Sequence, residues 1–345
     1  MKKSLVGFLI FISMFLGFQF LNTPVQAAVT PTVNYSVSPE SATNQIDKKV
    51  GYYDLKVSPN QKENIKFKIN NNSASTQSYD IQINRATTDV NGVIVYNKHG
   101  VKPDHDLKYN IENLVTYPKN VNVPAKSSKE VTVGIQAPSG HFEGELLGGI
   151  LVEENNQINN KKKVKGVSLR NKYDYVLGLQ LQQSTDTVKP DLKFDKAFQV
   201  TTNSDQISVE GQMDNDVPEL EKKVSVDAQI TPKNSKKIIL KSDKKNMSIA
   251  PDSKFDYPVN VNTPSGTGKN KRLKPGTYTM YLNVKANNGQ NAWKMKRNFT
   301  ISSRENKQLN KKVPNRSHDL WIILGAIIAM VIIAGSVIYI YRKRR

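Results

Sequence analysis

The sequence has no cysteine among its 345 residues, and aromatic residues make up only 8%. The lack of cysteine excludes a fold held by disulfide bonds and a metal site built on thiolates. Glycine (19 residues) and proline (16 residues) are close to their average share, which excludes a collagen-like or wholly disordered chain. A chain of this length has room for one large domain or two modest ones. The composition therefore favours ordinary folded domains.

Basic residues exceed acidic ones, with 50 Lys and Arg against 30 Asp and Glu. Six of the basic residues flank the apolar runs at the two chain ends: Lys2, Lys3, Arg342, Lys343, Arg344 and Arg345. The stretch between them keeps the other 44 bases and all 30 acids, so the positive surplus belongs mainly to the body of the protein. Such a surface attracts polyanions by its summed field.

The first 27 residues have the pattern of a secretory signal peptide. Lys2 and Lys3 precede an apolar run at 5–20, and small residues surround Ala27, where we expect cleavage. The alternative is an uncleaved membrane anchor, because the apolar run is long for a signal. Export together with the lack of cysteine is typical of a bacterial surface protein rather than a disulfide-rich eukaryotic one. We expect the body to lie outside the cell.

The segment 320–341 is apolar and uncharged over 22 residues, enough to cross a hydrocarbon core of about 30 Å as a helix. Under the positive-inside rule the basic tail at 342–345 would stay in the cytoplasm. The predicted membrane anchor comprises Leu320, Trp321, Tyr341, Arg342, Lys343, Arg344 and Arg345. A sortase substrate is the alternative, but Pro314 is all that its neighbourhood shares with a Leu-Pro-x-Thr-Gly element. We therefore expect a single-pass membrane protein.

The segment between the two apolar runs shows the period-two alternation of half-buried strands, as in Ile65, Phe67 and Ile69. A weak internal repeat occurs at 121–142 and again at 247–278. In each copy a strand, a proline turn and a second strand precede a Gly-x-aromatic element. The sequence thus predicts an all-β fold of two immunoglobulin-like β-sandwich domains plus one C-terminal transmembrane helix. The predicted organisation is a signal peptide at 1–27, a first sandwich at 32–187, a second sandwich at 188–303, a loose spacer at 304–319, the transmembrane helix at 320–341 and a cytoplasmic tail at 342–345.

Catalytic chemistry has few candidates in this sequence. Glu143 and Glu145 would share one face of a predicted strand about 6.5–7 Å apart, a separation found in glycosidases. Exposed strand carboxylates are far commoner than catalytic pairs, so a wall hydrolase is the less favoured reading. His105 between Asp104 and Asp106 lacks further ligands at a defined spacing. We predict no enzyme activity, no cofactor and no metal.

Binding features are denser than catalytic ones. Lys161, Lys162 and Lys163 form a basic run, which fits either a contact with an anionic polymer or a solvated surface. Tyrosines gather in the first predicted domain, and amphipathic rings serve equally in sugar contacts and in sheet packing. The candidates there are Tyr52, Tyr53 and Tyr96. Nucleic acid is excluded as a partner because an exported body does not meet it.

Taken in order, several segments resemble the WxL-interacting protein family of Gram-positive surface proteins. In the first domain these are 44–47, 51–55, 86–89, Asn91-Gly92, 142–150 and 171–175. In the second they are 247–255, 275–278, Trp293 and 299–301. The order of these segments, rather than any one of them, is specific. One departure is that Lys294 and Met295 follow Trp293 where a second aromatic residue is expected.

The resemblance implies a non-enzymatic protein of the Gram-positive cell wall. Its first domain would bind peptidoglycan or an anionic wall polymer, and its second domain would bind WxL-domain proteins and host matrix proteins. We expect the second domain to present sheet edges and Tyr281 or Trp293 to its partner. An adhesin acting mainly on host matrix is the alternative function, and a glycan hydrolase is a more distant one.

Overall fold

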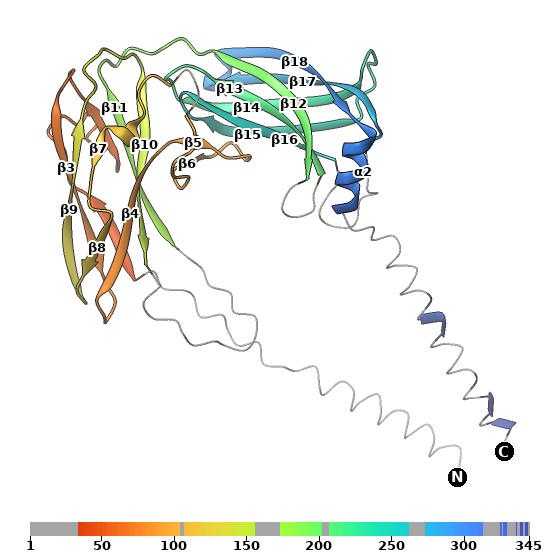
Figure 1. The fold of residues 1–345 in the computed structure, drawn as a ribbon, viewed down its shortest axis with the longest axis horizontal. Coiled ribbons are helices and arrows are strands. Elements are labelled where there is room, and N and C mark those ends of the chain that lie inside the picture. Colours follow the sequence, from red (N-terminus) through yellow and green to blue (C-terminus); the bar gives the residue numbers. More distant parts are fainter. Residues whose placement is uncertain are drawn as a thin grey trace.

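The computed structural model describes residues 34–103, 107–155, 173–201, 207–261 and 273–312, together with residues 325, 327–329, 336, 339–340 and 342–343. The strands form two β-sandwiches that follow one another along the long axis (Figure 1). Each sandwich has its own apolar core, built from residues between Tyr35 and Leu181 in the first and between Leu192 and Ile301 in the second. The all-β part of the sequence prediction agrees with this architecture.

The first sandwich packs a four-stranded sheet against a five-stranded sheet. The four-stranded sheet has the order β1 (Tyr35–Pro39), β3 (Lys62–Asn71), β9 (Ser127–Gln136) and β7 (Val115–Thr116). The other sheet has the order β2 (Tyr53–Lys56), β11 (Asp174–Gln182), β10 (Glu145–Glu154), β4 (Gln77–Arg85) and β8 (Asn120–Val123). Alternate side chains of each strand point inward, so Phe67 and Ile69 are fully buried while Lys66 and Lys68 are exposed.

The second sandwich packs three strands against four. The smaller sheet has the order β12 (Leu192–Thr201), β13 (Ile207–Asn215) and β16 (Ser253–Asn260). The larger has the order β15 (Leu240–Ile249), β14 (Glu221–Pro232), β17 (Gly276–Ala286) and β18 (Asn291–Ile301). Short 3-10 turns lie at Ile111–Asn113 (η2) in the first sandwich and Asn287–Gly289 (η4) in the second. A buried ring at the start of β17 closes a corner, because the Tyr278 hydroxyl donates to the Lys274 carbonyl at 2.7 Å.

The internal repeat has a structural counterpart in one buried asparagine per sandwich. Asn71 ends β3, and its Nδ2 donates to the carbonyls of Ser75 at 2.9 Å and Pro124 at 3.0 Å. Asn215 ends β13, and its Nδ2 donates to the carbonyls of Glu219 at 2.8 Å and Ala250 at 3.0 Å. Each amide thus ties the turn that follows its own strand to the end of a later strand.

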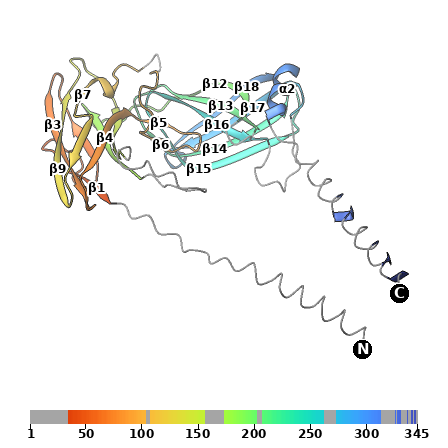
Figure 2. The same ribbon diagram turned by 60° about the horizontal axis from the view of Figure 1, so that its bottom comes forward.

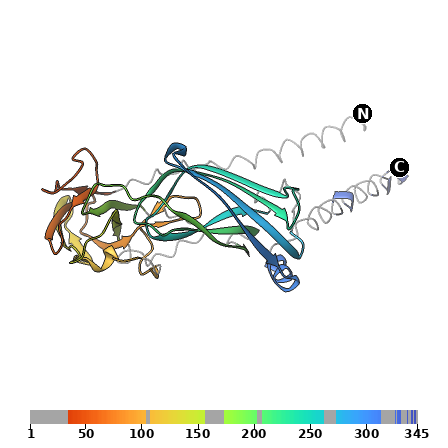
Figure 3. The same ribbon diagram turned by 90° about the horizontal axis from the view of Figure 1, so that it is seen from above.

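The two sandwiches meet through a short hairpin and the start of β10. The hairpin, β5 (Thr87–Thr88) and β6 (Ile94–Val95), leaves the first sandwich and reaches β15 and β16 (Figures 1 and 2). Its contacts across the joint include the bonds from Ala250 N to Thr88 Oγ1 and from Ser248 N to Gly92 O, both 2.8 Å, and the bond from Lys244 Nζ to Val90 O at 3.0 Å. Seen from above, the sandwiches form one elongated body with the hairpin at their junction (Figure 3).

The prediction of a transmembrane helix at 320–341 is corrected by the structure. Among the described residues, no helix is both long enough and apolar enough to cross a bilayer. The helix that follows β18, α2 (Ser303–Lys312), lies in the predicted spacer, is polar, and at ten residues rises only about 15 Å. Residues 1–33, 313–324 and most of 325–345 lie outside the described part, including Leu320, Trp321, Tyr341, Arg344 and Arg345, whereas Arg342 and Lys343 are described and exposed.

Candidate binding surfaces

Two tyrosine rings lie on a pair of glycines at the outer face of the five-stranded sheet. Gly149 of β10 and Gly178 of β11 are opposite each other in the antiparallel register. A Cβ at Gly149 would stand 2.6 Å from Cγ of Tyr96, and one at Gly178 would stand 3.2 Å from Cβ of Tyr52. The rings can approach the sheet this closely because the glycines carry no side chain. We call Tyr52, Tyr96, Gly149 and Gly178 the tyrosine shelf.

Polar groups surround the tyrosine shelf. Asn84 of β4 is opposite Gly149, donates from Nδ2 to the Tyr96 carbonyl at 2.7 Å, and lies 2.8 Å from Nδ1 of His99 through its Oδ1. On the far side, Gln182 donates to Asp54 Oδ1 at 2.9 Å. Tyr52 is 40% exposed, whereas Tyr96 is partly buried. This burial, followed by the charge of Glu145, raises the pKa of Tyr96 to about 12. The accessible Tyr52 ring therefore lies beside polar groups that are themselves buried, since Asn84 is 0% and Asp54 is 8% exposed. An accessible aromatic ring of this kind suits the apolar face of a sugar.

Glu145 joins the tyrosine shelf to the second sandwich. Its side chain is 6% exposed, its backbone N–H donates to Pro218 O, and its Oε1 accepts from Leu220 N, both at 2.8 Å. Burial raises the pKa of this carboxyl to about 7, while the Leu220 hydrogen bond and the charge of Lys222 oppose the rise. Its role is therefore that of a structural acceptor at the joint.

The glycosidase-like pair expected from the sequence does not form as predicted. Gly144 has a φ of +66°, and β10 begins only at Glu145, so Glu143 precedes the strand and is exposed while Glu145 is buried. The i, i+2 geometry that would place both carboxylates on one strand face is therefore lost at Gly144. His105 and both of its aspartate neighbours lie outside the described residues.

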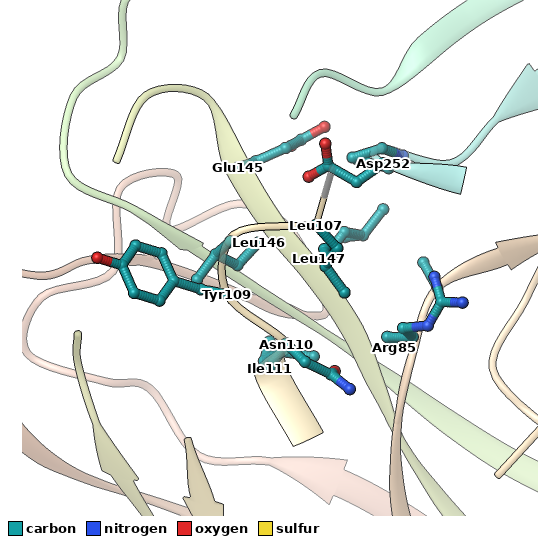
Figure 4. Close-up of a pocket in the computed structure, with 11 residues that line it drawn as sticks. Arg85, Leu107, Tyr109, Asn110, Ile111, Glu145, Leu146, Leu147 and Asp252 are labelled. Carbon is teal, nitrogen blue, oxygen red and sulfur yellow. The ribbon is translucent and has the colours of Figure 1, made fainter. Parts of the chain in front are cut away.

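A cavity of about 20 Å³ lies beside Glu145 where the two sandwiches meet (Figure 4). Glu145, Asp252, Arg85 and Tyr109 belong to its lining, with Leu146 and Leu147 of β10 between them in the view. That volume holds about one water molecule and leaves no room for a sugar or a cofactor. The cavity thus belongs to the packing of the joint rather than to a ligand site.

The predicted candidates in the second sandwich point in opposite directions. In the β17–β18 register Trp293 is opposite Val284, which is 1% exposed, so Trp293 faces the core, against which it packs. Tyr281 is opposite Lys296, is 36% exposed, and faces outward. The structure therefore separates two residues that the sequence analysis had grouped.

The other candidates are also sorted by the structure. Tyr53 is 1% exposed and its hydroxyl donates to Lys66 O at 2.6 Å, so it is a core residue beside the exposed Tyr52. Lys161, Lys162 and Lys163 lie outside the described residues.

The sequence analysis missed Asn84 and the two shelf glycines. The two glycines could have been found, because each interrupts the interior of an apolar strand pattern. Glycine at such a position indicates that another group approaches the strand closely.

Two family models match the chain. The first is described as WxL Interacting Protein, peptidoglycan binding domain, and matches residues 35–154; the second is described as WxL Interacting Protein, host binding domain, and matches residues 164–311. A search of curated proteins finds no match.

Solved structures similar to the chain include three bacterial chaperones. The class 5 fimbriae chaperone CfaA is 14% identical at a TM-score of 0.32, covering 77% of this chain and 98% of that chain. The Escherichia coli chaperone DraB is 12% identical at a TM-score of 0.28, covering 78% and 97%. The Pseudomonas aeruginosa CupB2 chaperone is 11% identical at a TM-score of 0.28, covering 69% and 93%. At such low TM-scores these likenesses carry no conclusion about function.

Proposed function

The chain belongs to the WxL-interacting protein family, and from that premise we propose that it is a non-enzymatic scaffold of the Gram-positive cell wall. The two matched models describe a peptidoglycan-binding and a host-binding domain, which is the composition of a cell-surface binding protein. In this proposal the first sandwich binds peptidoglycan, and the second sandwich holds a WxL-domain protein beside the wall.

The tyrosine shelf is the observation that supports peptidoglycan binding by the first sandwich. Tyr52 presents an accessible ring on a sheet face, and sugar rings pack their apolar faces on such side chains. Asn84 is 0% exposed and its Nδ2 donates to the Tyr96 carbonyl, so it holds the shelf in place rather than contacting the ligand. Gln182, on the other side of the shelf, is partly exposed, and peptidoglycan offers N-acetyl and peptide groups that such an amide can bind. A flat, open face also suits a polymer, whose chain has to extend beyond the site at both ends.

The test is sedimentation of the full chain with purified peptidoglycan. Tyr52→Ala should lower the affinity about fivefold to tenfold, the loss expected for one aromatic contact. Tyr173→Ala is the matched control, because Tyr173 is a 41% exposed tyrosine of the same sandwich away from the shelf. Equal binding by the two variants would reject the shelf as the peptidoglycan contact.

A scaffold has two separable activities, which distinguishes it from a simple wall anchor. The Tyr52→Ala protein should bind peptidoglycan more weakly and still co-purify with a WxL-domain protein to the same extent as the unaltered protein, because the second sandwich is unaltered. Loss of both ligands in the same variant would contradict separate sites.

An adhesin is the second candidate function, since the second matched model is described as host binding. Retention of the protein on matrix-coated plates without any WxL-domain protein would favour this candidate.

A further inference from the structure

The outer face of the larger sheet in the second sandwich carries a row of lysines. Lys285 lies on β17, and Lys294 and Lys296 lie on β18; all three are exposed. In the register Lys294 is opposite Asn283, Lys296 is opposite Tyr281, and Lys285 is one row further along. Cross-strand neighbours stand about 5 Å apart and successive rows about 7 Å. We call these three residues the lysine strip.

The lysine strip differs from the outer sheet face of the first sandwich in its lack of ion pairs with described residues. On the four-stranded sheet of the first sandwich, Lys66 is 2.7 Å from Glu130 and Lys68 is 2.9 Å from Glu40. No described residue forms an ion pair with Lys285, Lys294 or Lys296. The nearest acid in the register is Asp227 of β14, opposite Asn283, and it accepts a hydrogen bond from Gln229 at 3.0 Å.

We propose that the lysine strip binds a linear polyanion with repeated phosphate groups. Three unpaired cations at near-regular spacing on a flat face complement a chain of anions, and lysine binds phosphate as a point charge. The same strip does not suit a packed protein partner, because lysine is depleted from the cores of protein interfaces. Tyr281, which is opposite Lys296 and 36% exposed, is the large aromatic side chain that the described part of β17 adds to this face. This site lies apart from the tyrosine shelf and does not depend on peptidoglycan binding.

The experiment titrates the full chain against labelled polyphosphate over a series of salt concentrations. The triple variant Lys285→Gln, Lys294→Gln, Lys296→Gln should bind at least about tenfold more weakly at low salt, because it lacks the three positive charges that would face the polymer. The slope of log affinity against log salt concentration should be smaller in magnitude by about two to three, because binding of the variant releases fewer counterions.

The matched control removes three exposed lysines from the turn between β14 and β15: Lys233→Gln, Lys236→Gln, Lys237→Gln. This variant has the same net charge as the first and should bind within about twofold of the unaltered protein. Equal losses in the two triple variants would overturn the proposal in favour of a diffuse field. Equal affinity for polyglutamate would overturn the phosphate assignment, and a larger loss in Tyr281→Ala than in the lysine variant would indicate a packed contact instead.

Discussion

At the scale of single residues, Glu221 shows how the two sandwiches differ at one repeated position. It is fully buried, and neither of its carboxylate oxygens has a hydrogen-bond partner among the described residues. It stands six residues after Asn215, as Gln77 stands six residues after Asn71 in the first sandwich. Burial, followed by the charge of Glu219, raises the pKa of Glu221 from 4.5 to about 7. The first sandwich thus has a neutral amide where the second has an acid that resists ionisation.

We predict that Glu221→Gln stabilises the protein above neutral pH. Because the folded pKa lies above the unfolded one, Glu221 favours folding fully below pH 4.5, and that contribution is lost as the pH rises through about 7. At pH 8 the variant should gain up to about 3 kcal/mol in the free energy of unfolding, and near pH 5 it should gain little. Urea unfolding at the two pH values measures the difference.

The control for this prediction is Glu130→Gln, which removes an exposed acid of the Lys66 ion pair. The side-chain hydrogen bond from Lys66 lowers the pKa of Glu130, so its contribution has the opposite sign: it is present at neutral pH and lost as the pH falls. An exposed pair of this kind has little effect on stability. An equal gain at pH 8 in both variants would show that overall charge, rather than burial, sets the effect.

The shelf glycines give a second prediction at this scale. Gly149→Ala should displace the Tyr96 ring, since the new Cβ would stand 2.6 Å from its Cγ, and should weaken peptidoglycan binding. Gly178→Ala meets Tyr52 at 3.2 Å and should have the smaller effect. Peptidoglycan sedimentation together with the thermal midpoint separates lost binding from lost folding. A larger binding loss in Gly178→Ala would contradict the geometry of the shelf.

At the scale of elements, the strands were predictable because their signal is local. Alternation such as Ile65, Phe67 and Ile69 depends only on one buried and one exposed face. The helix α2 also had a local signal that the sequence analysis missed, a capping box in which Glu305 N donates to Ser302 Oγ at 3.1 Å and Ser302 N donates to Glu305 Oε2 at 3.0 Å. By contrast, the inward direction of Trp293 depends on its register with β17, which no short pattern contains.

The β5–β6 hairpin leads to a prediction about one turn glycine. Gly92 has a φ of +76°, and a Cβ there would stand 2.5 Å from the buried side chain of Met247 in the second sandwich. Gly92→Ala should therefore combine a backbone strain of about 1–2 kcal/mol with a collision across the joint. Gly100→Ala is the matched control, because Gly100 has a φ of +65° with nothing within 4 Å.

The measurement for the hairpin is hydrogen exchange at Ser248, whose amide donates to Gly92 O. We expect faster exchange there in Gly92→Ala and no change in Gly100→Ala. Urea unfolding should show the Gly92 variant to be the less stable by about 1–3 kcal/mol. Similar exchange in the two variants would mean that the hairpin does not hold the joint.

At the scale of the whole molecule, the joint determines whether the two sandwiches behave as one body. It consists of the hairpin on one side and Gly144, Glu145 and Pro218 on the other. The sequence analysis treated Glu143 and Glu145 as a possible catalytic pair, because nothing local indicates that a strand end will meet a second domain. Such a contact brings together residues about 75 positions apart, as in the bond from Leu220 N to Glu145 Oε1.

Gly144→Ala should uncouple the sandwiches without disrupting either core. Gly144 has a φ of +66°, and a Cβ there would stand 2.0 Å from the Pro218 carbonyl oxygen, so the backbone segments have to separate. We expect calorimetry to resolve two unfolding transitions in this variant and one in the unaltered protein, and small-angle scattering should report a broader range of shapes for the variant. Gly51→Ala is the control, since nothing lies within 4 Å of that position. A single transition in Gly144→Ala would show that contacts which the substitution leaves unchanged, such as the hairpin's bonds to Ser248 and Ala250, suffice to couple the two domains.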